Sequence, residues 1–207
     1  GIDEIFKGLN VDYLIEGGQT MNPRTEDMLN AISEVNADNI FILPNNSNII
    51  LAAEQAKALT EDKNIIVIPS KNIPQGITAL INFIYEKSPE ENTAKMIEEM
   101  EFVKSGQVTY AVRDTNIDGK EIKQGNIMGL GGKTILSVGT NIKDTTIELI
   151  KALIDEDTQL VSLYYGEEVT EEVAQELADV VSSDYPNIDV DVQYGGQPIY
   201  YFLVSAE

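Results

Sequence analysis

Polar and cationic side chains on three predicted loops are the residues of this chain best suited to bind a ligand or a partner. The first loop follows an apolar run at residues 11–15 and contains Gly17 and Gly18, which let another group approach the backbone closely. The other two loops follow the apolar runs at residues 39–43 and 64–68. The candidate binding residues on the three loops are Thr20, Asn22, Arg24, Asn45, Asn46, Ser47, Ser70 and Lys71.

The first loop leads into a predicted helix start. Asn22-Pro23 followed by Thr25-Glu26-Asp27 is typical of the first turn of a helix, whose free N–H groups can attract an anion. The two acidic residues already supply negative charge there, so the preferred guest stays open. Arg24 and Lys71 are either ordinary surface cations or anchors for an acidic group on a ligand or partner.

The residue types that most enzymes use for catalysis are absent. The chain has no histidine and no cysteine. This excludes disulfides, thiol nucleophiles, Ser-His-Asp arrangements and zinc sites of the usual kind, and leaves acid–base chemistry to carboxylates, lysine or tyrosine. We therefore predict no catalytic residue and no metal site in this chain.

Residues 114–119 (DTNIDG) match the first half of a calcium-binding loop, with oxygen ligands at alternate positions and a glycine at the sharp turn. The bidentate glutamate expected at the twelfth position is Gly125, and flanking helices are missing. We predict an Asp-Gly hairpin turn instead of a calcium site.

Two glycine-rich segments predict turns. Residues 129–134 (GLGGKT) end like a phosphate-binding loop, but Ile127 occupies the position of the required first glycine, so we expect a connection between strands. Residues 195–198 (GGQP) predict a hairpin turn before a buried last strand over residues 200–204.

Apolar runs and helical segments alternate in the first half of the chain. Strands are predicted over the three apolar runs named above, and helices over residues 26–35 and 49–59, where apolar residues recur at helical spacing. This alternation indicates a parallel sheet with helices packed on it. Because parallel strands share a direction, the three loops should gather at one edge of the sheet.

The second half combines hairpins with strand–helix alternation. Ser88-Pro89 begins a helix that runs to about residue 104. Further strands are predicted over residues 108–113, 121–128, 133–138, 159–164, 188–193 and 200–204, and helices over 142–154 and 170–183. We predict a two-lobed α/β fold: residues 1–87 form a lobe with a mostly parallel sheet flanked by helices, and residues 88–207 a lobe with a mixed sheet and helices.

Acidic residues dominate the composition. Asp and Glu number 35 against 14 Lys and Arg, giving a formal net charge of −21, which repels nucleic acid and anionic lipid. No apolar run approaches the roughly 18 residues needed to span a bilayer, and no secretory signal is visible. We expect a soluble cytoplasmic protein with no nucleic-acid partner and no membrane insertion. Because the chain opens at Gly1 inside a predicted helix, we interpret it as a fragment of a longer polypeptide.

Four motifs, taken in order, resemble the C-terminal domain of bacterial fatty acid kinase A, formerly grouped with dihydroxyacetone-kinase-like proteins. They are EGGQTMNP at 16–23, LPNNSN at 43–48, IPSKNIPQG at 68–76 and GGQP at 195–198. The resemblance implies a DegV-like, two-lobed fold like that of the family's fatty-acid-binding partner, fatty acid kinase B. It also implies that the strand that normally precedes the opening helix is missing here.

In the family that this chain resembles, ATP and magnesium bind to an N-terminal domain, which phosphorylates a fatty acid carboxylate presented by the carrier protein. None of that domain is present in this sequence, so no cofactor is expected here. The resemblance implies that the C-terminal domain helps to dock the carrier. The expected partners are therefore the fatty-acid-binding carrier and the other domains of the same polypeptide.

DegV-like carriers hold the fatty acid carboxylate with hydroxyls from a Thr-Ser-x-Pro-Ser loop and a Ser-Gly-Thr loop. Residues 20–24 (TMNPR) keep the threonine and proline of the first loop, while residues 46–48 (NSN) replace the second. The first loop therefore resembles a carrier loop whose serines are gone, and we interpret it as part of a docking surface.

We predict a noncatalytic C-terminal domain of a fatty acid kinase that docks the lipid-loaded carrier. One alternative is a DegV-like domain that itself binds a fatty acid or another small carboxylate near Thr20, Ser47 and Ser70. A second alternative is part of a dihydroxyacetone-type kinase, against which the lack of an intact phosphate loop argues.

Overall fold

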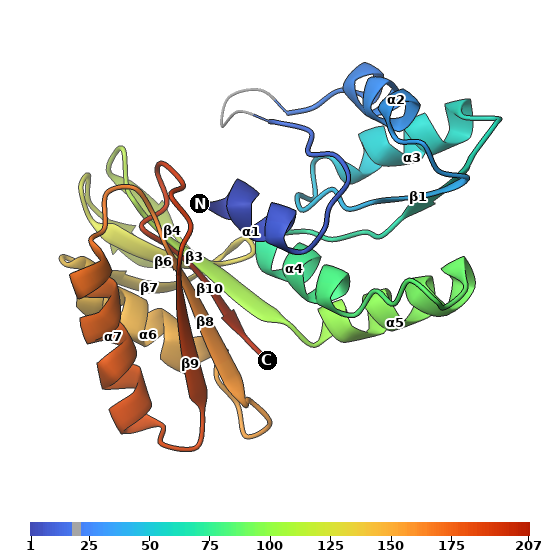
Figure 1. Ribbon diagram of the computed structural model, residues 1–207. Coiled ribbons are helices and arrows are strands. Elements are labelled where there is room, and N and C mark those ends of the chain that lie inside the picture. Colours follow the sequence, from blue (N-terminus) through green and yellow to red (C-terminus); the bar gives the residue numbers. More distant parts are fainter. Residues whose placement is uncertain (18–21) are drawn as a thin grey trace. The chain divides into compact units, whose positions relative to one another are not determined.

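The computed structural model of the protein describes residues 1–17 and 22–207 (Figure 1). Its contacts divide the chain into two compact units. The N-terminal unit is Asp3–Val103, and the C-terminal unit is Lys104–Glu207 together with Gly1–Ile2. The sequence-based boundary after residue 87 falls one helix earlier than this division, because the helix Pro89–Glu101 packs within the N-terminal unit.

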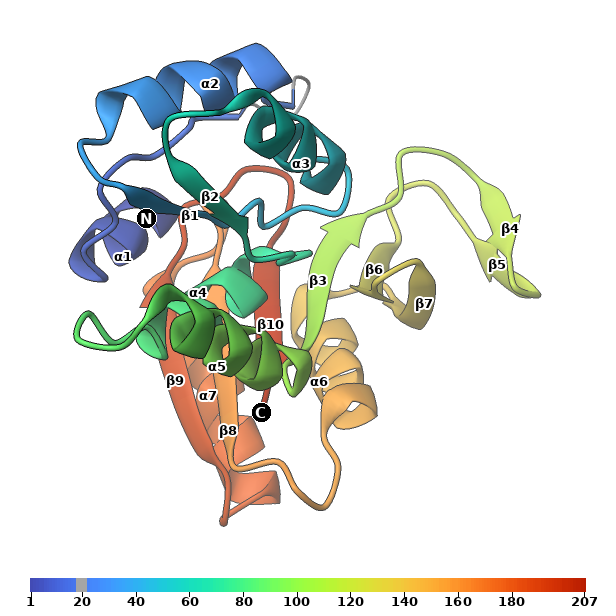
Figure 2. The same ribbon diagram turned by 90° about the vertical axis from the view of Figure 1, so that its right-hand side faces the viewer.

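The N-terminal unit is built on two parallel strands. Strands β1 (Asn39–Ile42) and β2 (Asn64–Val67) pair in register from Asn39 opposite Asn64 to Ile42 opposite Val67. The helices that accompany them are α1 (Ile2–Gly8), α2 (Thr25–Glu34), α3 (Ile50–Leu59), α4 (Ile73–Ile81) and α5 (Pro89–Glu101). Figure 2 shows α2 and α3 on one side of the strand pair and α4 and α5 on the other.

Side-chain alternation along the strands explains these three layers. Ile40 and Ile42 face a cluster formed with α2 and α3, whereas Phe41 faces a cluster formed with α4 and α5. Successive strand residues point to opposite faces of a sheet, so a strand whose residues are apolar at every position must be covered on both faces. The predicted parallel α/β arrangement of this half is confirmed.

Two predictions for the N-terminal unit were wrong. Residues 11–15 form no strand, because their backbone finds no strand to pair with, and only Ile15 packs against the core. Residues 73–76, expected to end a loop, instead begin α4. Pro74 fits there because the first turn of a helix needs no N–H donor, and Asn72 caps the helix by accepting a hydrogen bond from the Gln75 N–H at 2.9 Å.

The C-terminal unit contains a six-stranded mixed sheet in the order β7-β6-β3-β10-β8-β9. Its neighbouring strands are antiparallel except for β8 and β9, which are parallel. Helices α6 (Ile142–Leu153) and α7 (Glu171–Asp184) cover one face through Leu149 and Leu177. The strands are β3 (Lys104–Tyr110), β6 (Ile127–Gly131), β7 (Thr134–Gly139), β8 (Leu160–Tyr165), β9 (Asp189–Tyr194) and β10 (Phe202–Ala206).

Both tight turns predicted between strands are confirmed. Asp118 and Gly119, at φ 52° and 77°, connect β4 (Thr115–Ile117) to β5 (Lys120–Ile122), so residues 114–119 form a hairpin. Gly132, at φ 63°, lies in the turn between β6 and β7. Both φ values lie in the left-handed region that two-residue hairpin turns require.

Two other predictions for this unit were wrong. Residues 121–128 contribute to two strands, β5 and β6, rather than one. Residues 195–198 do not form a hairpin, because β8 lies between β9 and β10 and the segment must cross over it. The last strand is nevertheless buried along its whole length, as predicted.

Across the part of the chain that the structure describes, no helix combines the length and the apolar character that a membrane crossing requires.

Candidate functional site

The loops that follow β1 and β2 are joined by a pair of hydrogen bonds. The Ser70 hydroxyl donates to Asn45 Oδ1 at 2.8 Å, and the Asn45 N–H donates to Ser70 Oγ at 3.0 Å. Ser70 is completely buried. Because β1 and β2 are parallel, both loops leave the carboxyl edge of the strand pair, where ligands and partners of α/β proteins usually bind.

Gly76 makes room for this pair. A Cβ at position 76 would lie 1.9 Å from Asn45 Oδ1, so the first turn of α4 can approach Asn45 only without a side chain. Asn45 itself adopts φ 57°, a left-handed conformation that asparagine tolerates better than most residues. The three residues together fix the relative position of the two loops.

Asn46 and Ser47 lie in the turn that leads into α3. The Asn46 side chain accepts a hydrogen bond from the Asn48 N–H at 2.9 Å, and its C=O accepts one from the Ile49 N–H at 3.0 Å. Asn46 therefore shapes this turn, as asparagine often does. Ser47 is exposed.

Lys71 follows Ser70 directly and exposes its side chain. Its N–H donates to Gln75 Oε1 at 2.8 Å, which ties this loop to the first turn of α4. Gln75 and Gly76 were not among the candidate residues. The Asn72-to-Pro74 helix start was the signal that could have revealed them, because a cap followed by proline marks a first turn.

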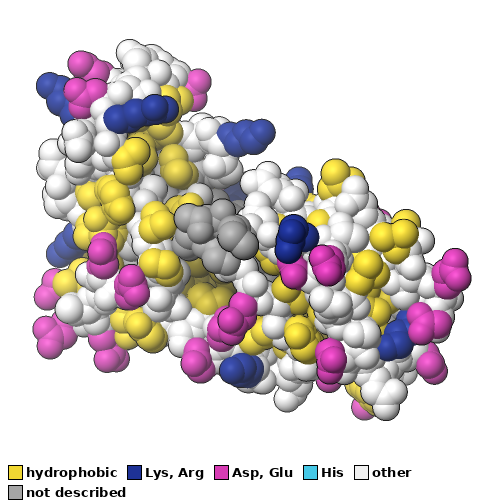
Figure 3. All heavy atoms as spheres, turned by 90° about the horizontal axis from the view of Figure 1, so that it is seen from above, with side chains coloured by type: hydrophobic (Ala, Val, Ile, Leu, Met, Phe, Trp, Pro, Cys, Tyr) yellow, Lys and Arg dark blue, Asp and Glu magenta, His cyan; other side chains and the backbone are white. Residues whose placement is uncertain are grey.

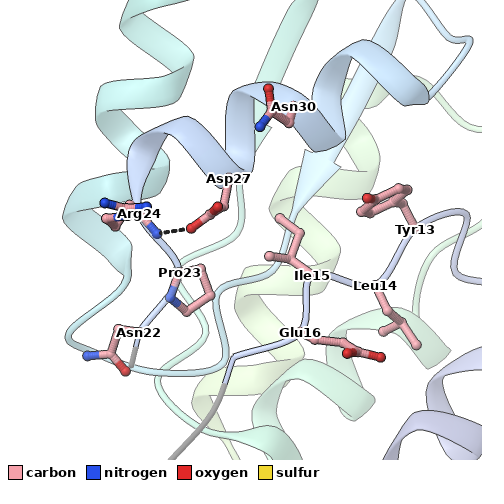
Figure 4. Close-up of a pocket in the computed structure, with 9 residues that line it drawn as sticks. All are labelled: Tyr13, Leu14, Ile15, Glu16, Asn22, Pro23, Arg24, Asp27 and Asn30. Carbon is pink, nitrogen blue, oxygen red and sulfur yellow. Dashed lines mark hydrogen bonds between the residues drawn. The ribbon is translucent and has the colours of Figure 1, made fainter. Parts of the chain in front are cut away.

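The predicted residues of the first loop lie beside a cavity of about 900 Å³. Asn22 and Arg24 line it from the start of α2, and the extended segment of residues 13–16 lines the opposite side (Figure 4). The Arg24 N–H donates to Asp27 Oδ2 at 2.8 Å, so Asp27 completes the helix start. Thr20 lies outside the described residues.

The structure thus divides the predicted residues into two groups. Asn45, Asn46, Ser47, Ser70 and Lys71 share the loop edge after β1 and β2, while Asn22 and Arg24 line the cavity. Among the described carboxylates, none forms an ion pair with Arg24 or Lys71. Both cations can therefore receive an acidic group from outside.

The surface around these cations is acidic in overall character. On the face shown in Figure 3, acidic side chains are spread among hydrophobic ones rather than gathered in one patch. Within residues 1–17 and 22–207, no three acidic side chains converge to hold a metal ion. The loop edge offers amide, hydroxyl and ammonium groups, which suit recognition rather than bond cleavage.

The two units define a two-lobed α/β protein of the DegV-like class, and solved structures share this fold. The chain aligns with a DegV family protein from Corynebacterium glutamicum at a TM-score of 0.65 and 12% identity, covering 99% of this chain and 91% of that one. It aligns with the Streptococcus pneumoniae fatty acid kinase B3 protein, a structure loaded with linoleic acid, at 0.63 and 17%, covering 100% and 83%. A dihydroxyacetone kinase from C. freundii, in complex with AMP-PNP and Mg²⁺, aligns at 0.60 and 14%, covering 89% and 41%. At these identities the likeness concerns the fold alone.

The chain belongs to the FakA-like C-terminal family of fatty acid kinases, whose model matches residues 1–207. Protein YloV of Bacillus subtilis is 46% identical to it over 207 residues, and an uncharacterized protein of Staphylococcus aureus strain USA300 is 42% identical. Both alignments cover the whole chain. The chain spans 37% of the length of the first relative and 38% of the second. The resemblance found in the sequence is confirmed.

Proposed function

We propose that this chain is the noncatalytic C-terminal domain of a fatty acid kinase, in which it docks the fatty-acid-binding carrier protein. Membership of the family and the fold shared with a linoleic-acid-loaded fatty acid kinase B3 support the proposal. The proposed partners are this carrier and the other domains of the same polypeptide.

The observation that carries the proposal is the internal use of the Ser70 hydroxyl. A serine that binds a carboxylate must offer its O–H to the ligand, but Ser70 is buried and donates to Asn45. The pair holds two loops in a fixed arrangement and leaves Asn46, Ser47 and Lys71 at the edge. A rigid polar edge of this kind favours contact with a folded partner.

Phosphoryl transfer is proposed to take place outside this chain. The segment that would have to bind phosphate, residues 129–134, is the turn between β6 and β7. We propose that ATP and magnesium bind in another domain of the longer protein, since this chain spans 37% of YloV.

One observation favours a second candidate function, the binding of a small carboxylate by this chain itself. Arg24 is exposed beside the cavity of about 900 Å³, and arginine pairs readily with carboxylates. Lipid extraction of the purified chain followed by mass spectrometry tests this reading. A stoichiometric acyl chain would favour it over docking.

The docking proposal is tested by titrating the purified chain with fatty-acid-loaded carrier in a calorimeter. We expect binding by the natural chain and a roughly tenfold weaker affinity for Lys71→Glu, because the loop edge loses its cation. Lys123→Glu makes the same charge change on an exposed lysine of the C-terminal unit and should leave the affinity within twofold.

The longer kinase provides an independent measurement. Deleting this domain should abolish phosphorylation of carrier-bound fatty acid while leaving ATP binding intact. The proposal fails if the carrier does not bind the chain and the deleted kinase still phosphorylates the lipid at the normal rate.

A further inference from the structure

The segment between α4 and α5 exposes apolar side chains to an unusual degree. Ile81 is 64% exposed, Ile84 42% and Tyr85 87%. We call these three residues the apolar knob. Single exposed apolar side chains are common on protein surfaces, but neighbouring ones that include a nearly bare tyrosine indicate a contact site.

The apolar knob is held in one conformation by a buried asparagine. Asn92, on α5, is 2% exposed. Its Oδ1 accepts a hydrogen bond from the Ile84 N–H at 2.8 Å, and its Nδ2 donates to the Ile84 C=O at 2.8 Å and to the Lys87 C=O at 3.3 Å. The Lys87 N–H also donates to the Ile84 C=O at 3.0 Å, which closes a four-residue turn. Tyr85 therefore lies at the tip of a clamped turn.

Phe83 anchors the same segment from the inner side. Its ring contacts Phe41 of β1 edge to face, with centroids 5.4 Å apart. Ser88 ends the segment by capping α5, where its Oγ accepts a hydrogen bond from the Glu91 N–H at 3.1 Å. The turn is thus fixed at both ends, and a side chain presented on a fixed backbone loses little conformational entropy on binding.

The apolar knob is a separate surface from the loop edge. Lys71 lies just before α4, and the knob begins at the last residue of this helix, so about 13 Å of helix separates them. A partner that grips both would have to span α4.

Charge decides which occupant fits the apolar knob. Glu86, Glu90 and Glu91 border it, and Lys87 is the one cation among residues 81–91. A second copy of this chain, with a net charge of −21, would bring the same acidic rim against it. An anionic membrane surface is disfavoured for the same reason. The fitting occupant is a different protein with an apolar pocket bordered by lysine or arginine.

We infer that the apolar knob is the anchor that the fatty-acid-binding carrier grips, with Tyr85 in an apolar pocket and a basic rim facing Glu86. This inference rests on the proposed docking function and adds a second contact, on the far end of α4 from Lys71. Tyrosine is among the residue types that contribute most to binding at protein interfaces.

The test is a titration of fatty-acid-loaded carrier into the natural chain, Tyr85→Ala and Leu59→Ala. Because Tyr85 is nearly fully exposed, its removal should leave the fold and its urea midpoint unchanged. We expect Tyr85→Ala to weaken carrier binding about 10- to 100-fold. Leu59, 65% exposed on α3, is the matched control and should change the affinity less than twofold.

The outcomes separate the two proposals. If the natural chain and Tyr85→Ala bind the carrier equally, the apolar knob is not its anchor, although docking stands. If the natural chain does not bind the carrier at all, the docking proposal fails and this inference with it. Sedimentation of the chain alone is the remaining measurement, since a dimer that Tyr85→Ala dissociates would assign the knob to a second copy and overturn the inference.

Discussion

The Ser70 hydroxyl and the Asn45 amide bind each other in both directions, Ser70 Oγ donating to Asn45 Oδ1 at 2.8 Å and accepting from the Asn45 N–H at 3.0 Å. The pair joins the loops after two parallel strands, 25 residues apart in the sequence. Both residues were candidates for contact with a ligand, and the structure gives them to each other. Their role is to position the residues beside them.

Replacing Ser70 with alanine should lower the free energy of unfolding by about 1–3 kcal/mol, because Asn45 Oδ1 loses its donor in a partly buried site. Urea denaturation followed by circular dichroism measures the change. Ser47→Ala is the control, because that side chain is exposed, and should shift stability by no more than about 0.5 kcal/mol. Equal effects of the two substitutions would contradict the role given to Ser70.

Gly76→Ala should destabilise the protein although it places alanine in a helix. In most helices this change stabilises by roughly 0.5–1 kcal/mol. Here the new Cβ would lie 1.9 Å from Asn45 Oδ1, so the Asn45–Ser70 pair must move or break. We expect a loss of about 1–3 kcal/mol in the same denaturation experiment. Gly8→Ala, at the end of α1 with open space around the new methyl group, should show no loss.

Asn92→Ala should release the turn that carries Tyr85. Three hydrogen bonds are removed from a buried site, which we expect to lower the free energy of unfolding by about 2–4 kcal/mol. Hydrogen exchange of the Ile84 amide gives the specific readout, because that N–H donates to Asn92. Its protection should fall more than that of the Phe102 N–H at the other end of α5. Unchanged protection of Ile84 would show that Asn92 does not hold the turn.

Stability should fall at high pH because of Tyr164. Burial raises the pKa of this phenol from 10.0 to about 12, and the Ser162 hydrogen bond offsets only part of the rise. Since the folded pKa lies above the unfolded value, the stabilisation is fully present below pH 10 and is lost as pH rises from about 10 to about 12. The difference corresponds to about 2–3 kcal/mol.

Tyr164→Phe removes this group without removing its ring. The variant should lose less stability between pH 9 and pH 12 than the natural protein, as measured by urea denaturation at each pH. Some decline should remain, because burial also raises the pKa values of Tyr165 and Tyr201. An identical decline in both proteins would refute the contribution of Tyr164.

Local patterns in the sequence predicted the elements whose causes are themselves local. Gly8 ends α1, and Asp118-Gly119 forms the expected hairpin, because each conformation is set by one or two residues. The two-sided burial of β1 also follows from apolar residues at every position.

Features that depend on distant partners were missed. The apolar run at residues 11–15 has the composition of a strand, but a strand exists only where another strand supplies hydrogen bonds. The Gly-Gly-Gln-Pro segment has hairpin chemistry, yet β8 occupies the place next to β9. For the same reason, Ser70 was selected correctly as a special residue, while its partner Asn45 became visible only in the structure.

The turn at Ile199 leads to the last prediction. Ile199 adopts φ 71°, a conformation that a β-branched residue normally avoids, and the Tyr200 N–H donates to the Pro198 C=O at 2.7 Å across it. The Thr109 hydroxyl donates to the Ile199 C=O at 3.0 Å and helps to hold this conformation. Strain of this kind costs about 1–3 kcal/mol.

Ile199→Gly should therefore stabilise the protein. Glycine relieves the strain, while its greater freedom in the unfolded chain removes only roughly 0.5–1 kcal/mol of that gain. Ile199 is 41% exposed, so little packing is lost, and we expect a net rise of about 0.5–1 kcal/mol in the free energy of unfolding. Ile117→Gly is the control: this isoleucine is 40% exposed but lies in β4, where glycine should be destabilising. If both substitutions destabilise equally, the backbone at Ile199 is not strained, and the exposed side chain rather than the turn explains its presence there.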